Sequence, residues 1–177
     1  MINHRAYEFR IYPNRAQQEL IARTFGCVRL VYNHYLAEKR QRYEESKATL
    51  SYADCAKDLT WLKKEKTFLK EVDSIALQQS LRHLDDAFTS FFRREKAGYP
   101  KFKSKRSGRR SYSTVCVNGN IRLEGGKIRL PKLGSVKIRQ HRQIPEEWIL
   151  KSVTVKQKPS GKYFVSILFE YENQVPE

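Results

Sequence analysis

The sequence is poor in features that mark several classes of protein. It has three cysteines among 177 residues, and they are widely separated: Cys27, Cys55 and Cys116. An odd number at such spacing gives neither a disulfide framework nor a CxxC zinc site, so we interpret the three side chains as packed hydrophobic groups. No run approaches the roughly 20 consecutive apolar residues of a membrane span, and the charged N-terminus lacks the apolar core of a secretory signal. We therefore expect a cytoplasmic, nucleoid-associated protein without a membrane partner.

Groups suited to catalysis are also scarce. The four histidines are far apart and form no HxxxH or HExxH pair. Asp85 and Asp86 are adjacent, so on a helix they would point about 100° apart rather than share one cation. The sequence contains no GxxxxGK[ST] phosphate loop and no GxSxG elbow. We expect no metal site, no cofactor and no catalytic residue in this chain.

Positive charge is abundant and unevenly distributed. Thirty-five Lys and Arg against 19 Asp and Glu give a net charge of +16, which an anionic partner such as a nucleic acid would balance. Half of this excess lies in residues 93–110, RREKAGYPKFKSKRSGRR, where Gly98, Pro100 and Gly108 indicate a connector rather than a helix. Tyr99 and Phe102 stand among the cations and could stack on exposed bases.

The run therefore predicts a site for RNA or single-stranded nucleic acid, with a merely soluble basic linker as the alternative. The candidate residues are Arg93, Arg94, Lys96, Lys101, Phe102, Lys103, Lys105, Arg106, Arg109 and Arg110.

Helical periodicity covers residues 13–97. Asn14 and Ser51 each precede an apolar helical stripe, with Gln17 and Asp54 three residues later as reciprocal capping partners. Gly26 interrupts the first stripe, which predicts two helices joined by a tight turn, a helix-turn-helix-like pair. Asp73 is expected to cap a further helix, the longest in the chain, which carries an apolar stripe from Ile75 to Phe92.

From Ser111 onward the pattern changes to short alternating runs separated by Asn-Gly, Gly-Gly and Ser-Gly turns, which predicts antiparallel strands. Residues 1–12 alternate in the same way. Small all-β units usually close into barrels, so the predicted class is α+β, an antiparallel β-barrel with an inserted helical domain. The expected domains are a discontinuous barrel (1–12 and 111–172), the insertion (13–97), the basic connector (98–110) and a tail (173–177).

Three polar residues lie where they could contact a nucleic acid. Tyr52 and Gln78 are near predicted helix N-termini, which attract phosphate groups. A Gln side chain can in addition read adenine in a major groove. Asn118 lies in a predicted hairpin turn. Each also has an ordinary structural explanation, because polar residues commonly begin helices and Asn-Gly strongly favours hairpins.

Five segments in order carry a family resemblance: YEFRIYPNRAQQELIARTFGCVRLVYNHYL, LSYADCAKDLTWLKK, VDSIALQQSLRHLDDAFTSFF, GYPKFKSKR and IRLPKLG. Together they resemble the N-terminal half of the TnpB (OrfB) family of transposon-encoded, RNA-guided DNA endonucleases. The resemblance implies a wedge β-barrel, OB-like, with an inserted recognition domain. It further implies that this half binds a guide RNA and a T-rich motif in double-stranded DNA.

Matched residue by residue, the resemblance assigns contact with the DNA motif to Tyr52, Ser74, Gln78, Val117 and Asn118. It places residues 101–106 in the part that holds RNA and the guide–target heteroduplex. In the family a RuvC-like nuclease domain follows the barrel, and residues 173–177 would lead to it. We therefore expect this chain to bind nucleic acid without cutting it, with the nuclease domain as a further partner in a longer or split protein.

Two other functions remain open from the sequence. A free-standing helix-turn-helix regulator would bind its operator through residues 14–43 without RNA. A metal-dependent nuclease or transposase would need a carboxylate cluster, for which the sequence shows no pattern.

Overall fold

The computed structural model describes residues 1–94, 96–106 and 110–173. Its contacts divide the chain into two compact units, one comprising Met1–Ala22 with Arg109–Glu177 and the other comprising Arg23–Gly108. We call them the barrel unit and the helical unit. The first helix, α1 (Arg15–Ser46), begins in the barrel unit and continues into the helical unit.

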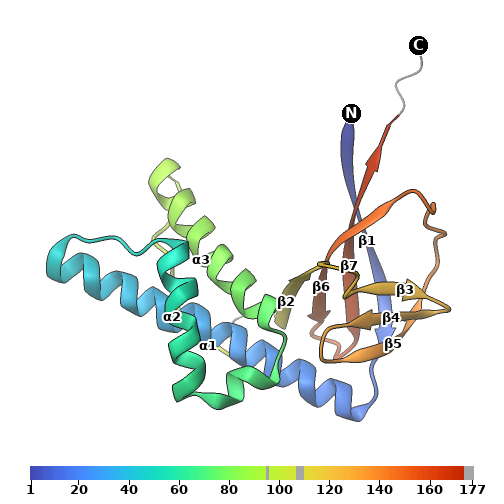
Figure 1. Cartoon of the computed structure of the whole chain (residues 1–177), viewed down its shortest axis with the longest axis horizontal. Coiled ribbons are helices and arrows are strands. Elements are labelled where there is room, and N and C mark those ends of the chain that lie inside the picture. Colours follow the sequence, from blue (N-terminus) through green and yellow to red (C-terminus); the bar gives the residue numbers. More distant parts are fainter. Residues whose placement is uncertain (95, 107–109, 174–177) are drawn as a thin grey trace. The chain divides into compact units, whose positions relative to one another are not determined.

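The barrel unit is a seven-stranded antiparallel sheet with the order β2-β6-β7-β1-β5-β4-β3. In Figure 1, β3, β4 and β5 run across the direction of β1, β6 and β7, so the sheet is strongly curled. Since β2 and β3 stand at the two ends of the order, the barrel predicted from the sequence is a curled half-barrel. The strands are β1 (Ile2–Tyr12), β2 (Arg110–Val115), β3 (Arg122–Glu124), β4 (Lys127–Leu130), β5 (Gly134–Arg139), β6 (Ile149–Gln157) and β7 (Tyr163–Glu172).

Alternation along each strand sets which face is buried, because successive side chains point to opposite faces of a sheet. Strand β1 is central: it pairs with β7 over most of its length and with β5 at its C-terminal end. The inward positions form a dry core that includes Phe9, Ile11, Ile128, Val136, Val153, Val155, Val165 and Ile167, all at most 1% exposed. The intervening residues form the outer face of the sheet.

The helical unit is built from most of α1 together with α2 (Tyr52–Glu65), the short 3-10 helix η1 (Thr67–Glu71) and α3 (Ser74–Arg93). Its core is apolar and includes Val31, Tyr35, Leu36, Leu59, Leu62, Leu69, Leu77, Leu81 and Leu84. Tyr35 donates from its hydroxyl to Asp58 Oδ2 at 2.8 Å, and burial together with this neighbouring carboxylate raises the pKa of Tyr35. The hydroxyl group of this buried side chain therefore has a hydrogen-bond partner within the apolar core.

The predicted caps are present. Asn14 Oδ1 accepts from Gln17 N and Gln17 Oε1 accepts from Asn14 N, at 2.8 and 2.9 Å, which starts α1. Asp73 Oδ1 accepts from Ile75 N at 2.9 Å and starts α3. Side chains that satisfy otherwise unpaired N–H groups at helix starts explain why these boundaries could be located from the sequence.

The break predicted at Gly26 is wrong, because α1 is a single helix of 32 residues that runs through it. A lone glycine costs a helix only about 1 kcal/mol relative to alanine. Here packing on both sides outweighs that cost, since Phe25, Cys27, Val31 and Tyr35 are all buried. At 20 residues, α3 is also shorter than α1, so it is not the longest helix as predicted.

The α+β class and the antiparallel β unit with accompanying helices are confirmed. Within the described ranges, no helix is both long and apolar enough to cross a membrane.

Candidate nucleic-acid interface

A polar face of α3 carries two of the residues that the sequence singled out. Ser74 and Gln78 are both exposed and lie one turn apart, and Arg82 continues the same line one turn further on. The guanidinium of Arg82 lies 4.3 Å from the ring centroid of Tyr52, the first residue of α2. Tyr52, Arg82, Gln78 and Ser74 therefore form a strip of polar side chains within the helical unit, which we call the α3 strip.

Capping at the start of α2 fixes Tyr52 in this strip. Ser51 Oγ accepts from Asp54 N and Asp54 Oδ2 accepts from Ser51 N, both at 3.1 Å, a reciprocal capping box. Hydrogen bonds from the backbone and side chain of Ser51 hold the pKa of Asp54 below its ordinary value, since they stabilise the carboxylate. The position of Tyr52, one residue after the cap, is thus set by local geometry.

Val117 and Asn118 lie in the turn after β2, in the barrel unit. Asn120 N donates to Val117 O at 3.2 Å, and the central residues Asn118 and Gly119 have φ of 53° and 69°. Two positive φ angles define a type I′ turn, which Asn and Gly tolerate best. Asn120 reinforces it, because its Oδ1 accepts from Val117 N at 2.7 Å and its Nδ2 donates to Val115 O. Asn118 and Val117 are exposed on this rigid turn.

Tyr52, Ser74 and Gln78 thus share the helical unit, whereas Val117 and Asn118 belong to the barrel unit. Convergence of the two groups on one DNA site stays a prediction.

The basic connector is attached to α1. Asn33 Nδ2 donates to Lys103 O, and Asn33 Oδ1 accepts from Lys103 N, both at 2.8 Å. The Lys103 ammonium lies 4.1 Å from the centroid of the Tyr32 ring, and burial there lowers the pKa of Lys103. The Lys103 ammonium thus lies against α1 while the residue as a whole is exposed, and its contact with phosphate stays a prediction.

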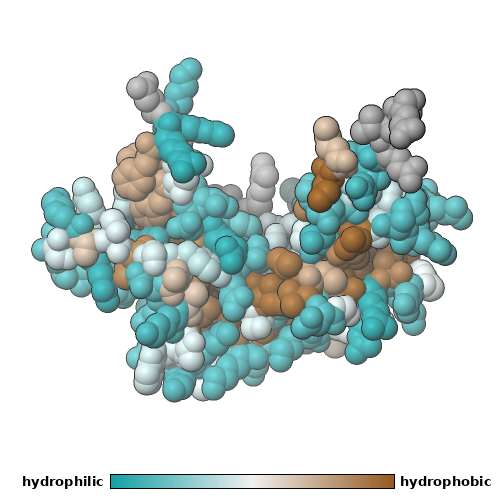
Figure 2. Space-filling view, turned by 45° about the horizontal axis from the view of Figure 1, so that its top comes forward, coloured by the Kyte–Doolittle hydropathy of each residue, from teal (hydrophilic) through white to brown (hydrophobic). Residues whose placement is uncertain are grey.

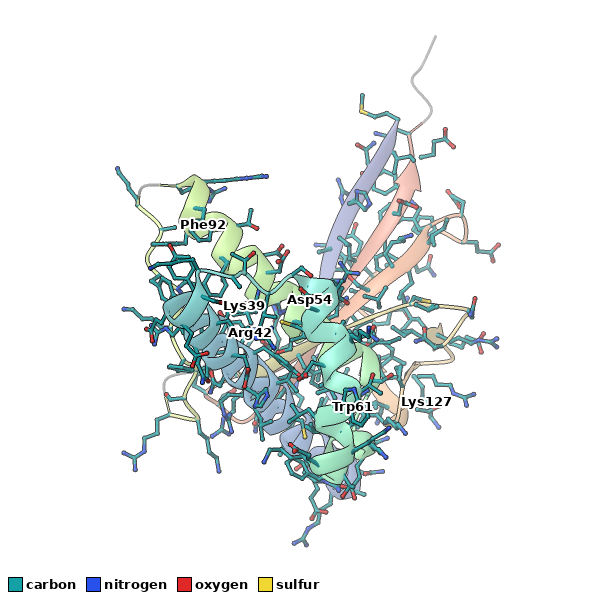
Figure 3. The ribbon with its side chains drawn as sticks, turned by 60° about the vertical axis from the view of Figure 1, so that its left-hand side comes forward. Lys39, Arg42, Asp54, Trp61, Phe92 and Lys127 are labelled. Carbon is teal, nitrogen blue, oxygen red and sulfur yellow. The ribbon has the colours of Figure 1, made fainter. Side chains whose placement is uncertain are left out.

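Aromatic side chains gather where the connector meets α1 and α3. The Arg40 guanidinium lies 4.8 Å from the Tyr99 centroid and 5.2 Å from that of Phe102. Tyr99 in turn makes edge contacts with Phe88 and Phe91 of α3. Phe92, on the last turn of α3 (Figure 3), is 73% exposed, and Phe102 is 49% exposed. Exposed rings beside cations can hold unpaired bases by stacking.

The remaining cationic candidates fall into two groups. Those of the helical unit are all exposed: Arg93, Arg94, Lys96, Lys101, Lys105 and Arg106. Arg110 instead begins β2 of the barrel unit, where its guanidinium donates to Gln157 Oε1 at 3.3 Å. Arg109 lies outside the described residues. Hydrophilic residues cover much of the face seen in Figure 2, as expected for a highly charged chain.

Sequence reasoning missed three residues of this surface: Asn33, Arg40 and Arg82. Arg82 could have been found, because it lies four residues after Gln78 on the same helix face. Asn33 and Arg40 gave no such signal, since their roles depend on a connector that returns to α1 from 70 residues further along the chain. Among the described residues, no three His, Cys, Asp or Glu side chains are grouped as a metal site would require.

Comparison with known proteins identifies the class. Residues 1–48 match a family model described as a helix-turn-helix domain, of the OrfB type. The chain is 38% identical over 169 residues to a Streptomyces pristinaespiralis protein and 33% identical over 173 residues to InsQ of Escherichia coli (strain K12). Both are named as candidate RNA-guided DNA endonucleases. The matches cover 94% and 97% of this chain but only 41% and 42% of those relatives.

A third relative, virulence protein VsdF of Salmonella dublin, is 37% identical over 111 residues, which cover 57% of this chain and 93% of VsdF. The family model and the first two relatives together define the class of this chain. The chain belongs to the TnpB (OrfB) family, as its sequence motifs indicated.

The region matched by the helix-turn-helix model contains one strand and one helix in this chain, β1 and α1. The operator-binding regulator considered above depends on a turn within residues 14–43, and α1 is continuous there. The structure therefore does not favour that alternative.

Proposed function

We propose that this chain is the nucleic-acid-binding part of an RNA-guided DNA endonuclease, holding a guide RNA and recognising a short T-rich motif in double-stranded DNA. The observation that carries the proposal is the α3 strip, in which Gln78 stands exposed between Ser74 and Arg82. Gln can bond the N6 and N7 groups of adenine in a major groove. In a T-rich motif those adenines lie on the strand opposite the thymines.

The Val117–Asn120 turn supplies complementary chemistry for the same motif. The Asn118 amide can make the same paired contacts to adenine as Gln, and the exposed Val117 methyl groups can contact a thymine methyl. A rigid turn loses little conformational entropy when its side chains bind. These properties support base recognition by Asn118 and Val117.

The connector is proposed to hold the guide RNA. Its exposed cations can neutralise phosphates, while Phe92 and Phe102 offer rings to unpaired bases. Two hydrogen bonds from Asn33 attach the connector to α1 at Lys103, which restrains this part of the connector. An attached connector favours a binding role over that of a free linker.

On this proposal the chain is associated with the nucleoid, where it holds RNA and DNA. Hydrolysis of the DNA belongs to a nuclease domain supplied by a longer or split protein. A RuvC-type reaction needs clustered carboxylates to hold its metal ions. We expect purified chain with magnesium and RNA to leave duplex DNA uncut.

The test is to isolate the chain from its host and sequence the RNA that copurifies. The proposal expects one dominant RNA species that spans a transposon end, and this RNA should be required for preference of T-rich duplexes. Copurification of no defined RNA, together with full sequence preference by the RNA-free protein, would instead support a DNA-binding regulator.

A further inference from the structure

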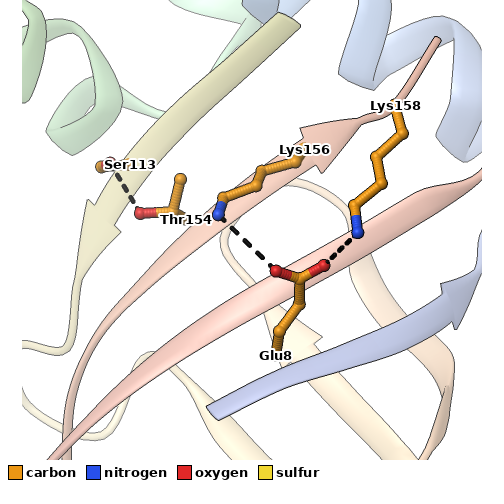
Figure 4. A network of polar contacts seen from close by, with 5 residues as sticks. All are labelled: Glu8, Ser113, Thr154, Lys156 and Lys158. Carbon is orange, nitrogen blue, oxygen red and sulfur yellow. Dashed lines mark hydrogen bonds and ion pairs between the residues drawn. The ribbon is translucent and has the colours of Figure 1, made fainter. Parts of the chain in front are cut away.

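The outer face of the half-barrel has two regions with opposite charge organisation. Where β1 meets β6 and β7, cations are matched by carboxylates. Glu8 lies 3.9 Å from Lys156 Nζ and 2.6 Å from Lys158 Nζ (Figure 4), and Glu170 lies within 4.0 Å of both His4 and Lys151. In this half of the face each of these three lysines has a carboxylate within 4.0 Å.

The other half places like charges opposite one another. Backbone register aligns Arg122 with Arg129, Lys127 with Lys137, and Arg10 with Arg139. Side chains at directly paired positions lie about 5 Å apart, and like charges there are destabilising. Glu124 is the one carboxylate at the outward positions of the described strands β3, β4 and β5. Such pairing calls for a compensating negative group.

Part of this charge is compensated internally. The Tyr12 ring lies 5.0 Å from the Arg10 guanidinium and 5.8 Å from the Lys137 ammonium. Lys127 (Figure 3) has Glu124 as its cross-strand neighbour. The Arg122–Arg129 pair has no carboxylate at a directly paired position, and Glu124 is only its diagonal neighbour. Within the described part of the chain no ion pair involves either arginine.

These two arginines line an open groove of about 580 Å³. Lys132 adds a third cation to it, from a turn in which its own φ is 68° and that of Gly134 is 73°. The other lining residues are Gly119, Asn120, Leu130, Pro131 and Gly134, and none is acidic. Three cations with no carboxylate in the lining make this groove suited to an anion.

The groove adjoins the turn that carries Asn118. A side-chain carbon added at Gly119 would lie 3.8 Å from Arg122 Nη2, so the guanidinium lies directly against the turn. A base edge bonded to Asn118 is joined through its sugar to a phosphate that must lie close by. Arg122, Arg129 and Lys132 line the groove beside this turn, so such a phosphate would be within their reach only if the duplex passed along it.

We propose that this groove binds the phosphate backbone of duplex DNA beside the motif, so that Arg122, Arg129 and Lys132 position the duplex whose bases Asn118 reads. The inference rests on the proposed function for its DNA partner. In protein–DNA interfaces, phosphate contacts commonly fix the register of the duplex and base contacts give specificity. The three cations would have the first role and Asn118 the second.

The test is the salt dependence of binding to a duplex with a T-rich run and to a mixed-sequence duplex, for the full chain loaded with RNA. The logarithm of the affinity falls linearly with the logarithm of the salt concentration, and each phosphate that is no longer neutralised makes this slope less steep by about 0.9. Between 50 and 200 mM salt, wild-type affinity should therefore fall ~12-fold more than that of the Arg122→Gln, Arg129→Gln double variant, whichever duplex is used. Preference for the T-rich duplex should persist.

The matched control removes two cations from the other half of the same face, where both pair with Glu8, as Lys156→Gln with Lys158→Gln. It should keep the wild-type slope, as should the charge-preserving variant Arg122→Lys with Arg129→Lys. Circular dichroism would verify that each variant is folded.

Three outcomes would overturn the inference. If the double variant keeps the wild-type DNA slope, the groove does not hold DNA although the proposed function stands. If its slope falls for guide RNA and not for DNA, the groove belongs to the RNA. If the wild type binds no duplex DNA, both the inference and the proposed function fail.

Discussion

Asn33 and Lys103 exchange two hydrogen bonds, each 2.8 Å long, between the side chain of one and the backbone of the other. The side-chain amide of Asn33 thus bonds both the N–H and the C=O of Lys103, as the backbone of a neighbouring strand would. These bonds attach the basic connector to α1. A net hydrogen bond contributes about 1 kcal/mol, so this pair can decide whether the connector is ordered. RNA binding should therefore depend on a residue that carries no charge.

Replacing Asn33 by Ala should weaken RNA binding about 3- to 30-fold, because the connector must then be ordered at the expense of binding free energy. Its salt slope should stay unchanged, since no cation is removed. Filter binding across a salt series would measure both quantities. Gln41→Ala is the control, because Gln41 lies on the same helix and bonds along it, to Glu45 at 3.0 Å. Equal behaviour of the two variants would show that the attachment has no part in RNA binding.

Neutralising exposed cations of the connector should, in contrast, change the salt dependence of RNA binding. The triple variant Lys101→Gln, Lys105→Gln and Arg106→Gln should flatten the slope by about 0.7–0.9 for each phosphate that the variant no longer neutralises. Lys103→Gln should change it less, because the Lys103 ammonium lies over Tyr32. Titration of structured RNA at several salt concentrations would separate these variants. A slope unaffected by the triple substitution would make the run a solvated linker.

Gly26→Ala tests the continuity of α1. A side-chain carbon at this position meets nothing nearer than Arg29 Nη2 at 3.9 Å. In a continuous helix the substitution should raise the free energy of unfolding by about 0.5–1 kcal/mol. Urea denaturation would measure it. Destabilisation would point to a turn at this residue, as a helix-turn-helix requires.

The cysteines should differ in reactivity. Burial raises the pKa of Cys27 and of Cys55, so at a given pH each has less of the reactive thiolate than an ordinary thiol. Cys116 is partly exposed and should be alkylated first near neutral pH. Because the thiolate fraction increases with pH until the pKa is passed, the reaction of Cys27 and Cys55 should keep accelerating to a higher pH than that of an ordinary thiol. Mass spectrometry of timed samples would follow each site, with urea-unfolded protein as the control. Simultaneous labelling in the folded protein would contradict the buried positions.

How much could be predicted from the sequence depended on whether the signal was local. The caps at Asn14, Ser51 and Asp73 were identified because their partners lie two or three residues away. The strands were located because alternation between buried and exposed positions is visible along the chain. The prediction of a break at Gly26 was wrong because the packing of buried residues before and after Gly26 outweighs the low helix propensity of glycine.

The groove was not predictable for a related reason. Arg122, Arg129 and Lys132 lie in a segment that is less densely basic than residues 93–110, and only strand register makes Arg122 the direct neighbour of Arg129. The dense run at residues 93–110 gave a much stronger signal, although its ends belong to different units of the structure.

The most direct test of the account compares binding of the RNA-loaded chain to duplexes with and without a T-rich motif. Gln78→Ala and Asn118→Ala should each reduce the preference for the motif by about 5- to 150-fold, the equivalent of 1–3 kcal/mol for one base-reading side chain. Affinity for duplexes that lack the motif should change little. Gln79→Ala, at the neighbouring position of α3, should keep the full preference. If Gln78→Ala and Asn118→Ala also keep it, or weaken every duplex equally, these residues do not read DNA sequence and the central claim is wrong.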